Sequence, residues 1–262
     1  TLSSYYQSEI GVLRWMVELG RVDINTEVSM LASHLALQRE GHLEAVFHVF
    51  AYLKAKHNSR LALDPTYPDI DESDFKKYNW VEFYGDVKEA IQPNMPEPRG
   101  KSIDLRMYVD SDHAGDKLLR RSRAEFLVYI KMPSIQWLSK KQLTIEIFLF
   151  GAEFVAMIHG LETLRGLRYK LRMMGVAIEG ASYIYGDNMP VINNIQRPES
   201  TLRKKSNSIC YHAMRESVAM GESLTAHVPS EENPADLLTK VLTGWKREYF
   251  VRGIPYDIYD DH

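Results

Sequence analysis

Residues 105–115 read LRMYVDSDHAG, and this stretch decides the fold expected for the second half of the chain. Its first part, Leu105 to Val109, is a short run typical of a β-strand, and Asp110 closes that strand. Two further β-like runs follow at 126–130 and 135–138, separated by polar turns. Three strands in sequence indicate a meander.

A long helical stripe comes next, with apolar residues three or four positions apart for most of the length from Phe150 to Met174. It is followed by a strand candidate at 182–185, a helix at about 208–220 and a fifth strand candidate at 224–228. Pro234 is placed to open a closing helix, because a proline in the first turn loses no hydrogen bond. This order of strands and helices predicts an α/β or α+β domain.

The first sixty residues have a different pattern. Apolar residues recur at helical spacing in three stretches, 10–17, 28–35 and 43–53, which predicts three amphipathic helices. From 64 to 100 the chain is acidic and punctuated by proline, whose ring fixes its own backbone angle and restrains the preceding residue. We therefore predict a helical segment at 1–63, a linker at 64–100, a second domain at 101–243 and a C-terminal tail at 244–262.

The composition is that of a folded protein, since 45% of the 262 residues are hydrophobic and 26% are charged. The single Cys210 excludes an internal disulfide and a thiolate zinc cage, which fits a reducing compartment. No run of about 18 apolar residues occurs, so no membrane partner is expected. The chain begins at Thr1, and we expect it to be cut from a longer product. The net charge is −3, yet the basic clusters all follow residue 100, which predicts a local nucleic-acid footprint there.

Acidic residues recur at the ends of the predicted elements of the second domain. Asp110 closes the first strand, Glu153 lies near the start of the long helix, Asp187 follows the fourth strand and Asp236 begins the last helix. Hard divalent cations prefer oxygen ligands, and two metals about 4 Å apart need several carboxylates for charge balance. The four residues are therefore candidates for a two-metal phosphodiesterase site. Spacing alone also allows the simpler interpretation that they cap turns and helices.

Six short motifs surround these carboxylates in a fixed order. They are YVDSDHAG (108–115), RRS (120–122), WLSKKQ (137–142), GAEFVAM (151–157), YGDN (185–188) and NPADLLTK (233–240). From about residue 104 to 242 the series resembles the ribonuclease H domain of Copia-type (Pseudoviridae) retrotransposon Pol polyproteins. Upstream, the motifs YYQSEIGVL (5–13), VDI (22–24), HLEA (42–45) and YLK (52–54) resemble the C-terminal end of the same polyprotein's reverse transcriptase, where the family has a helical thumb-like segment. The Tyr-x-Asp-Asp hairpin of the polymerase palm does not occur in the sequence, so we expect no polymerase activity.

The resemblance implies a ribonuclease H-like fold, a five-stranded mixed sheet flanked by helices. It also implies that Asp110, Glu153, Asp187 and Asp236 are the catalytic residues and the ligands of two Mg²⁺ or Mn²⁺ ions. The implied reaction is endonucleolytic hydrolysis of the RNA strand of RNA–DNA hybrids, in cytoplasmic virus-like particles and then the nucleus. The implied protein partner is the remainder of the polyprotein, which carries the reverse transcriptase palm and the integrase. Hybrids are recognised through shape, phosphates and 2′-hydroxyls, and the candidate contacts are Asn188, Arg121, Lys140, Lys141, Arg203, Lys204 and Lys205.

Three other interpretations of the same acids fail on the sequence. A calcium loop beginning at Asp110 needs a bidentate Glu at its twelfth position, where Arg121 stands. An aspartate-nucleophile phosphatase needs a Thr where Ala114 stands, and an integrase has its Glu last rather than second.

A degenerate remnant that keeps the fold and binds nucleic acid without catalysis stays open. Glu125 stands where the family usually has a small residue, and Pro190 falls where a helix should begin.

Overall fold

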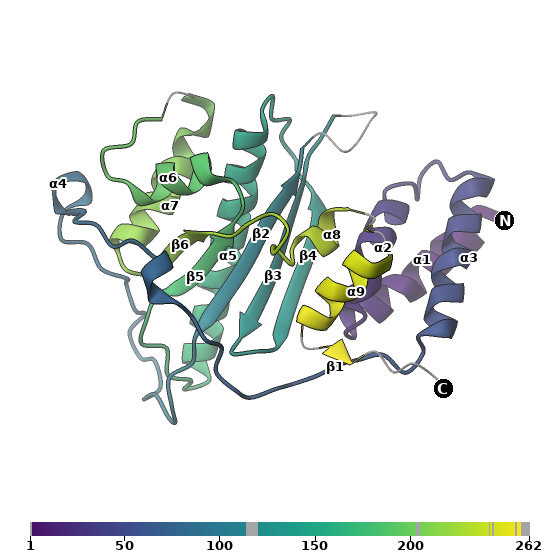
Figure 1. Cartoon of the computed structure of the whole chain (residues 1–262), viewed down its shortest axis with the longest axis horizontal. Helices are drawn as coiled ribbons and strands as arrows, with labels where there is room; N and C mark the ends of the chain where they lie inside the picture. Colours follow the sequence, from purple (N-terminus) through teal and green to yellow (C-terminus); the bar gives the residue numbers. More distant parts are fainter. Residues whose placement is uncertain are drawn as a thin grey trace.

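The computed structural model describes residues 2–113, 120–202, 205–240, 242, 244–254 and 256–257. Its centre is a five-stranded sheet in the order β4-β3-β2-β5-β6 (Figure 1). The strands β2, β3 and β4 form an antiparallel meander, whereas β5 and β6 run parallel to β2. The predicted five-stranded mixed sheet of the ribonuclease H-like type is therefore confirmed. The strand bounds are β2 (Leu105–Asp112), β3 (Arg123–Ile130), β4 (Ser134–Lys141), β5 (Ser182–Gly186) and β6 (Ser223–His227).

One face of the sheet is covered by α5 (Leu149–Met173), with α6 (Met189–Gln196), a 3₁₀ turn at Lys205–Asn207 and α7 (Ser208–Ala219) beside it (Figure 1). Alternate residues of β2 face this layer, so that Met107 and Val109 pack in one core with Met157 of α5. Gly160 allows α5 to approach the sheet closely, because a Cβ there would lie 2.4 Å from Met107 Cε. Burying each of these apolar side chains contributes about 1.5–3 kcal/mol. This packing fixes α5, and with it Glu153, against β2.

The opposite face packs against α8 (Asp236–Thr239) and α9 (Gly244–Gly253). Leu127 and Tyr129 of β3 are buried there with Leu238 and Phe250. The intervening residues of β3, such as Phe126, belong to the core on the α5 side, because neighbouring side chains of a strand point to opposite faces. The short α8 is thereby held over β2 and β3, where its first residue lies close to Asp110.

The three predicted N-terminal helices are confirmed as α1 (Leu2–Glu18), α2 (Asn25–Ala32) and α3 (Glu40–Ala55), with a 3₁₀ turn at Val22–Ile24. They form their own apolar core, in which Tyr6 and Leu13 are fully buried. Figure 1 shows this helical segment beside the β4 edge of the sheet. Hydrogen bonds attach α2 to the second domain: Thr26 Oγ1 donates to the Leu237 carbonyl over 2.6 Å, and Ser29 Oγ donates to the Ser139 carbonyl over 2.7 Å.

The segment from 64 to 100, predicted as a linker, follows the surface of the second domain. It contains a 3₁₀ turn at Glu72–Asp74 and the one-turn α4 (Val81–Tyr84), and its Phe75 ring packs 4.7 Å from the ring of Tyr183. Its Glu89 forms ion pairs with Arg168 and Arg172 of α5, both at 2.5 Å. Before this segment, β1 (Arg60–Leu61) pairs antiparallel with β7 (Tyr256–Asp257). Within the described ranges, no helix has both the length and the apolar character needed to cross a membrane.

Candidate metal centre and nucleic-acid interface

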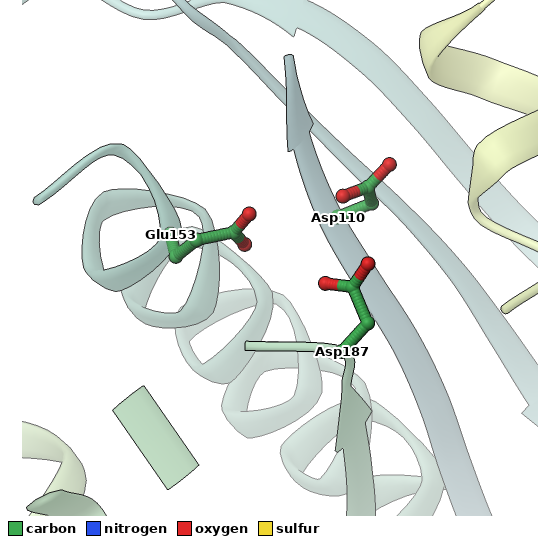
Figure 2. Close-up of side chains that lie close together, drawn as sticks. All are labelled: Asp110, Glu153 and Asp187. Atoms are coloured by element: carbon green, nitrogen blue, oxygen red, sulfur yellow. The ribbon is translucent and has the colours of Figure 1, made fainter. Parts of the chain in front are cut away.

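Three carboxylates meet at the carboxyl ends of the two central parallel strands. Asp110 lies near the end of β2, Asp187 directly follows β5, and Glu153 lies in the first turns of α5. One carboxylate oxygen of each lies within 4.8 Å of the others, and Figure 2 shows the three groups pointing toward one another. Their convergence follows from the topology, because β2 and β5 are adjacent and parallel and α5 begins above the same edge.

The first turn of α5 is held in place by a buried glutamine from the end of the meander. Gln142 Nε2 donates to the Ala152 carbonyl over 2.9 Å, and its own backbone N–H donates to the Ser122 carbonyl over 2.8 Å. This side chain therefore connects the exit of β4 to the residue before Glu153. Gln142 was part of a quoted motif, but the sequence alone did not predict its positioning role.

The chemistry of the cluster fits a divalent cation. Asp110 and Glu153 are each only 3% exposed. Asp110 Oδ1 accepts from the Ser111 N–H, whereas Oδ2 has no hydrogen-bond partner among the described residues. Burial, followed by the charge of Asp187, raises the pKa of Asp110 to about 7. Burial, followed by the charges of Asp110 and Asp187, raises the pKa of Glu153 well above its usual value. Unpaired buried oxygens that repel one another are stabilised by a hard cation, so these residues can hold a divalent metal.

The fourth predicted carboxylate, Asp236, lies beside this group and not within it. Its charge also contributes to the raised pKa of Asp110, but it is not among the three side chains that converge within 4.8 Å. Asp236 Oδ1 accepts from Lys240 Nζ over 2.7 Å, and Oδ2 accepts from Lys246 Nζ over 3.3 Å. The structure therefore brings three of the four predicted ligands together, and it pairs the fourth with two lysines that the sequence did not single out.

Hydrogen bonds position the loops that carry the acids. Asn233 is fully buried, and its Nδ2 donates to the Val109 carbonyl over 3.0 Å, next to Asp110. Ser230 Oγ donates to Asp187 Oδ2 over 2.7 Å, while His227 Nε2 lies 3.1 Å from the Asp187 carbonyl. The NPAD motif contained the signal for Asn233, but its contact with β2 spans 124 residues and is visible only in the fold.

Gly186 immediately precedes Asp187 and lies against α5. A Cβ at this position would lie 2.2 Å from Met157 Cε, closer than any real contact. Met157 is itself 1% exposed and cannot swing into solvent without leaving the core. A side chain in place of the glycine of the YGDN motif would therefore force the tip of Met157 to move within the core, on the helix that carries Glu153.

A fifth carboxylate, Glu125, is buried next to the cluster. It faces Asp110 across the β2–β3 pair and is completely inaccessible. Oε1 accepts from Ser139 Oγ over 3.2 Å and lies 3.5 Å from Arg123 Nε, whereas Oε2 has no partner in the part of the chain that the structure describes. Burial raises the pKa of Glu125 well above its usual value, against the opposing charge of Arg123. The residue noted in the sequence as atypical thus faces the interior beside the carboxylate cluster.

The predicted nucleic-acid contacts fall into three groups. Asn188 is the N-cap of α6, where its Oδ1 accepts from the Val191 N–H over 3.3 Å, and Pro190 is accommodated in the first turn. The second group, Arg121, Lys140 and Lys141, lies near the carboxylate end of the sheet. Lys141 of β4 is the cross-strand neighbour of Arg123 of β3, which in turn is the cross-strand neighbour of Asp112 of β2. Lys205 is exposed just before α7. Arg203 and Lys204 lie outside the described residues.

Comparison with known proteins points to one group of relatives. The chain is 25% identical over 238 residues to the retrovirus-related Pol polyprotein from transposon RE1 of Arabidopsis thaliana, a match that covers 91% of this chain and 14% of the relative. Its homologues are retrovirus-related Pol polyproteins of plant transposons. The Pol polyprotein from transposon TNT 1-94 of Nicotiana tabacum is 24% identical over 237 residues, covering 90% of this chain and 15% of that protein. The chain thus spans about a seventh of these Pol polyproteins. No protein-family model matches it.

Solved ribonuclease H structures overlap with part of the chain. The LC11 ribonuclease H1 isolated from compost has a TM-score of 0.41 at 16% identity, covering 52% of this chain and 91% of that one. The N-terminal ribonuclease H domain of a Mycobacterium tuberculosis protein has a TM-score of 0.41 at 13% identity, covering 58% and 98%.

Proposed function

We propose that this chain hydrolyses the RNA strand of RNA–DNA hybrids endonucleolytically, as the ribonuclease H part of a Copia-type Pol polyprotein. The observation that carries the proposal is the convergence of Asp110, Glu153 and Asp187 within 4.8 Å at the carboxyl ends of β2 and β5. The homology to Pol polyproteins supports it. The remainder of the polyprotein is the proposed protein partner, and cytoplasmic particles followed by the nucleus are the proposed location.

Asp110, Glu153 and Asp187 would hold two Mg²⁺ or Mn²⁺ ions, with Asp236 as the proposed fourth ligand. When bound, such ions supply Lewis acidity at a phosphodiester and lower the pKa of an attacking water. Lys240 and Lys246 neutralise Asp236 and keep its carboxylate beside Asp110. Asn233 and Ser230 fix the loops that carry Asp236 and Asp187.

Substrate recognition would use the basic residues around this edge of the sheet. Phosphate contacts position a nucleic acid without reading its sequence, and the 2′-hydroxyl distinguishes RNA from DNA. Lys140 is exposed and Lys141 half-buried at the end of β4, and both can reach a phosphate without breaking the core. The full proposed set is Asn188, Arg121, Lys140, Lys141, Arg203, Lys204 and Lys205.

The test is cleavage of an end-labelled RNA–DNA hybrid by the purified chain in the presence of Mg²⁺ or Mn²⁺. We expect the wild type to cut the RNA strand at internal positions and the Asp110→Asn variant to leave it intact. Circular dichroism of both proteins controls for folding. Equal rates for folded wild type and folded Asp110→Asn protein would refute the proposed enzyme.

Glu125 favours a second candidate, a degenerate remnant that binds nucleic acid without catalysis. Its buried Oε2 has no partner within the described ranges and its carboxyl faces Asp110, so it adds a buried acid beside the cluster. A chain that binds the hybrid and gains no thermal stability from Mg²⁺ or Mn²⁺ would support the remnant. Stabilisation by the metal that is lost in Asp110→Asn would speak against it.

A further inference from the structure

A basic groove separates the N-terminal helices from the edge of the sheet. It has a volume of about 440 Å³ and lies between α1 and α2 on one side and β4 with the start of β3 on the other. Its lining contains four basic side chains and one acidic side chain, Glu18. The four basic residues are Arg14, Arg123, Lys140 and Lys141. Arg123 is paired with the buried Glu125, so Arg14, Lys140 and Lys141 supply the net positive charge of the lining, which attracts a polyanion.

The two walls of the groove are fixed to each other. Ser29 of α2 donates to the Ser139 carbonyl over 2.7 Å, and Arg123 donates to Ser29 Oγ as well as to Ser139 Oγ over 3.3 Å. Farther along, Arg247 of α9 pairs with Glu27 of α2 over 2.8 Å. The groove is therefore preformed, and a ligand need not order the helical segment in order to bind.

Two residues of the groove lining lie on strands that neighbour the one carrying Asp110. Arg123 is the cross-strand partner of Asp112, two residues beyond Asp110, and Lys141 is the next partner on β4. Two residues along a strand and two strand spacings place Lys141 roughly 12 Å from Asp110. At about 3.4 Å per nucleotide along a helix axis, this corresponds to three or four nucleotides from the candidate cutting site.

We propose that this groove binds the sugar–phosphate backbone of the nucleic-acid substrate a few nucleotides from the carboxylate cluster, with Arg14 of α1 as a phosphate contact. The inference rests on the proposed function for the identity of the substrate. It assigns the helical segment a direct part in binding, which goes beyond the contacts proposed for the second domain. The chemistry recognised is the regular negative charge of a nucleic-acid backbone, and no base is read.

The test uses full-length chain carrying Asp110→Asn, so that binding of a fluorescent RNA–DNA hybrid is measured without cleavage. Adding Arg14→Gln should weaken binding several-fold at low salt. It should also lower the slope of log Kd against log salt by about 0.7–0.9, the loss of one phosphate contact. When the salt is raised from 50 to 200 mM, this difference in slope makes the loss of affinity about threefold smaller for the Arg14→Gln protein than for its parent. The matched control is Lys54→Gln, an exposed lysine of α3 outside the groove, which should leave both quantities unchanged.

Equal affinities and equal salt slopes for the Arg14→Gln and Lys54→Gln proteins would overturn the groove assignment. So would a failure of the unsubstituted chain to bind the hybrid at low salt, or equally tight binding of poly-glutamate. The cleavage assay separates this result from the proposed function. A chain that cuts the hybrid but is indifferent to Arg14 refutes the groove alone. A chain that cuts nothing, yet loses hybrid affinity through Arg14→Gln, refutes the nuclease alone.

Discussion

Replacing Asp110 by Asn should stabilise the metal-free protein while abolishing its stabilisation by metal. In the folded chain, burial and the charge of Asp187 raise the pKa of Asp110 from 3.8 to about 7. The folded protein therefore retains a proton that the unfolded chain releases, and stability from this group is present below pH 4 and lost as pH rises toward 7. This rise in the pKa of Asp110 is equivalent to about 4 kcal/mol of lost stability at pH 8. Asn removes the charge at nearly the same volume and avoids that cost.

The measurement is thermal or urea unfolding at pH 8, first with a chelator and then with Mg²⁺ or Mn²⁺. With chelator, the free energy of unfolding of Asp110→Asn should exceed that of wild type by up to about 4 kcal/mol. Its Tm should be higher by roughly 2–4 °C for each kcal/mol. With metal, wild type should gain stability and the variant should not. Glu199→Gln, which neutralises an exposed acid, is the control and should change neither value. A metal-free Asp110→Asn protein no more stable than wild type would refute the view that the cluster is a site of uncompensated charge.

Three further outcomes are expected. Lys240→Met removes the cation from Asp236 Oδ1. Without metal it should lower the free energy of unfolding by about 1 kcal/mol, a small loss because the lysine is half-exposed, and it should tighten Mn²⁺ binding in calorimetry. The control Lys54→Met should change neither quantity. The pKa of Glu89 is held at about 2, because the hydrogen bonds from Arg172 and Arg168 outweigh the effect of its burial. Glu89→Gln should therefore lose up to about 3 kcal/mol of unfolding free energy in urea at pH 7. The difference from wild type should vanish as the pH falls from about 5 to 2, where Glu89 becomes protonated. Gly186→Ala should lower the free energy of unfolding by about 1–3 kcal/mol and weaken metal binding, because its Cβ collides with Met157. The control Gly180→Ala should be tolerated, since no described atom lies within 4 Å of its Cβ. Equal stability of the two alanine variants would contradict the packing role.

The sequence predicted the five strands of the sheet and its main helices, and its motifs indicated that the acids meet. Alternating and helical apolar patterns mark these elements locally, and residues at the carboxyl ends of β2 and β5 must come together once those strands are parallel neighbours. The pairing of Asp236 with Lys246 was not predictable in this way. Nor was the interior position of Glu125, because a strand pattern does not say which polar residue acquires a partner from another element. The stretch from 244, predicted as a tail, instead carries α9, whose Phe250 is buried against the sheet.

The segment from 64 to 100 shows a second reason why sequence patterns fall short. Its acidic residues and prolines are typical of a solvated linker, and these properties depend only on composition. Its position along the second domain depends on a few specific contacts, such as Phe75 with Tyr183 and Glu89 with two arginines of α5. Contacts of this kind join residues about 80 to 110 positions apart and leave no periodic signal.

The attachment of α2 to the second domain also determines when the chain can finish folding. The hydrogen bond from Thr26 joins residues 211 positions apart, and the ion pair from Glu27 joins residues 220 positions apart. Neither partner exists until the ribosome has made nearly all of the described chain, although the meander of β2, β3 and β4 is complete about a hundred residues earlier. Closing a loop of this length costs little more free energy than closing a shorter one, but contacts between such distant residues slow folding. The helical segment can therefore complete its docking only after Arg247 has been made, whereas the groove wall that joins Ser29 to Ser139 needs no residue beyond β4 and can close earlier.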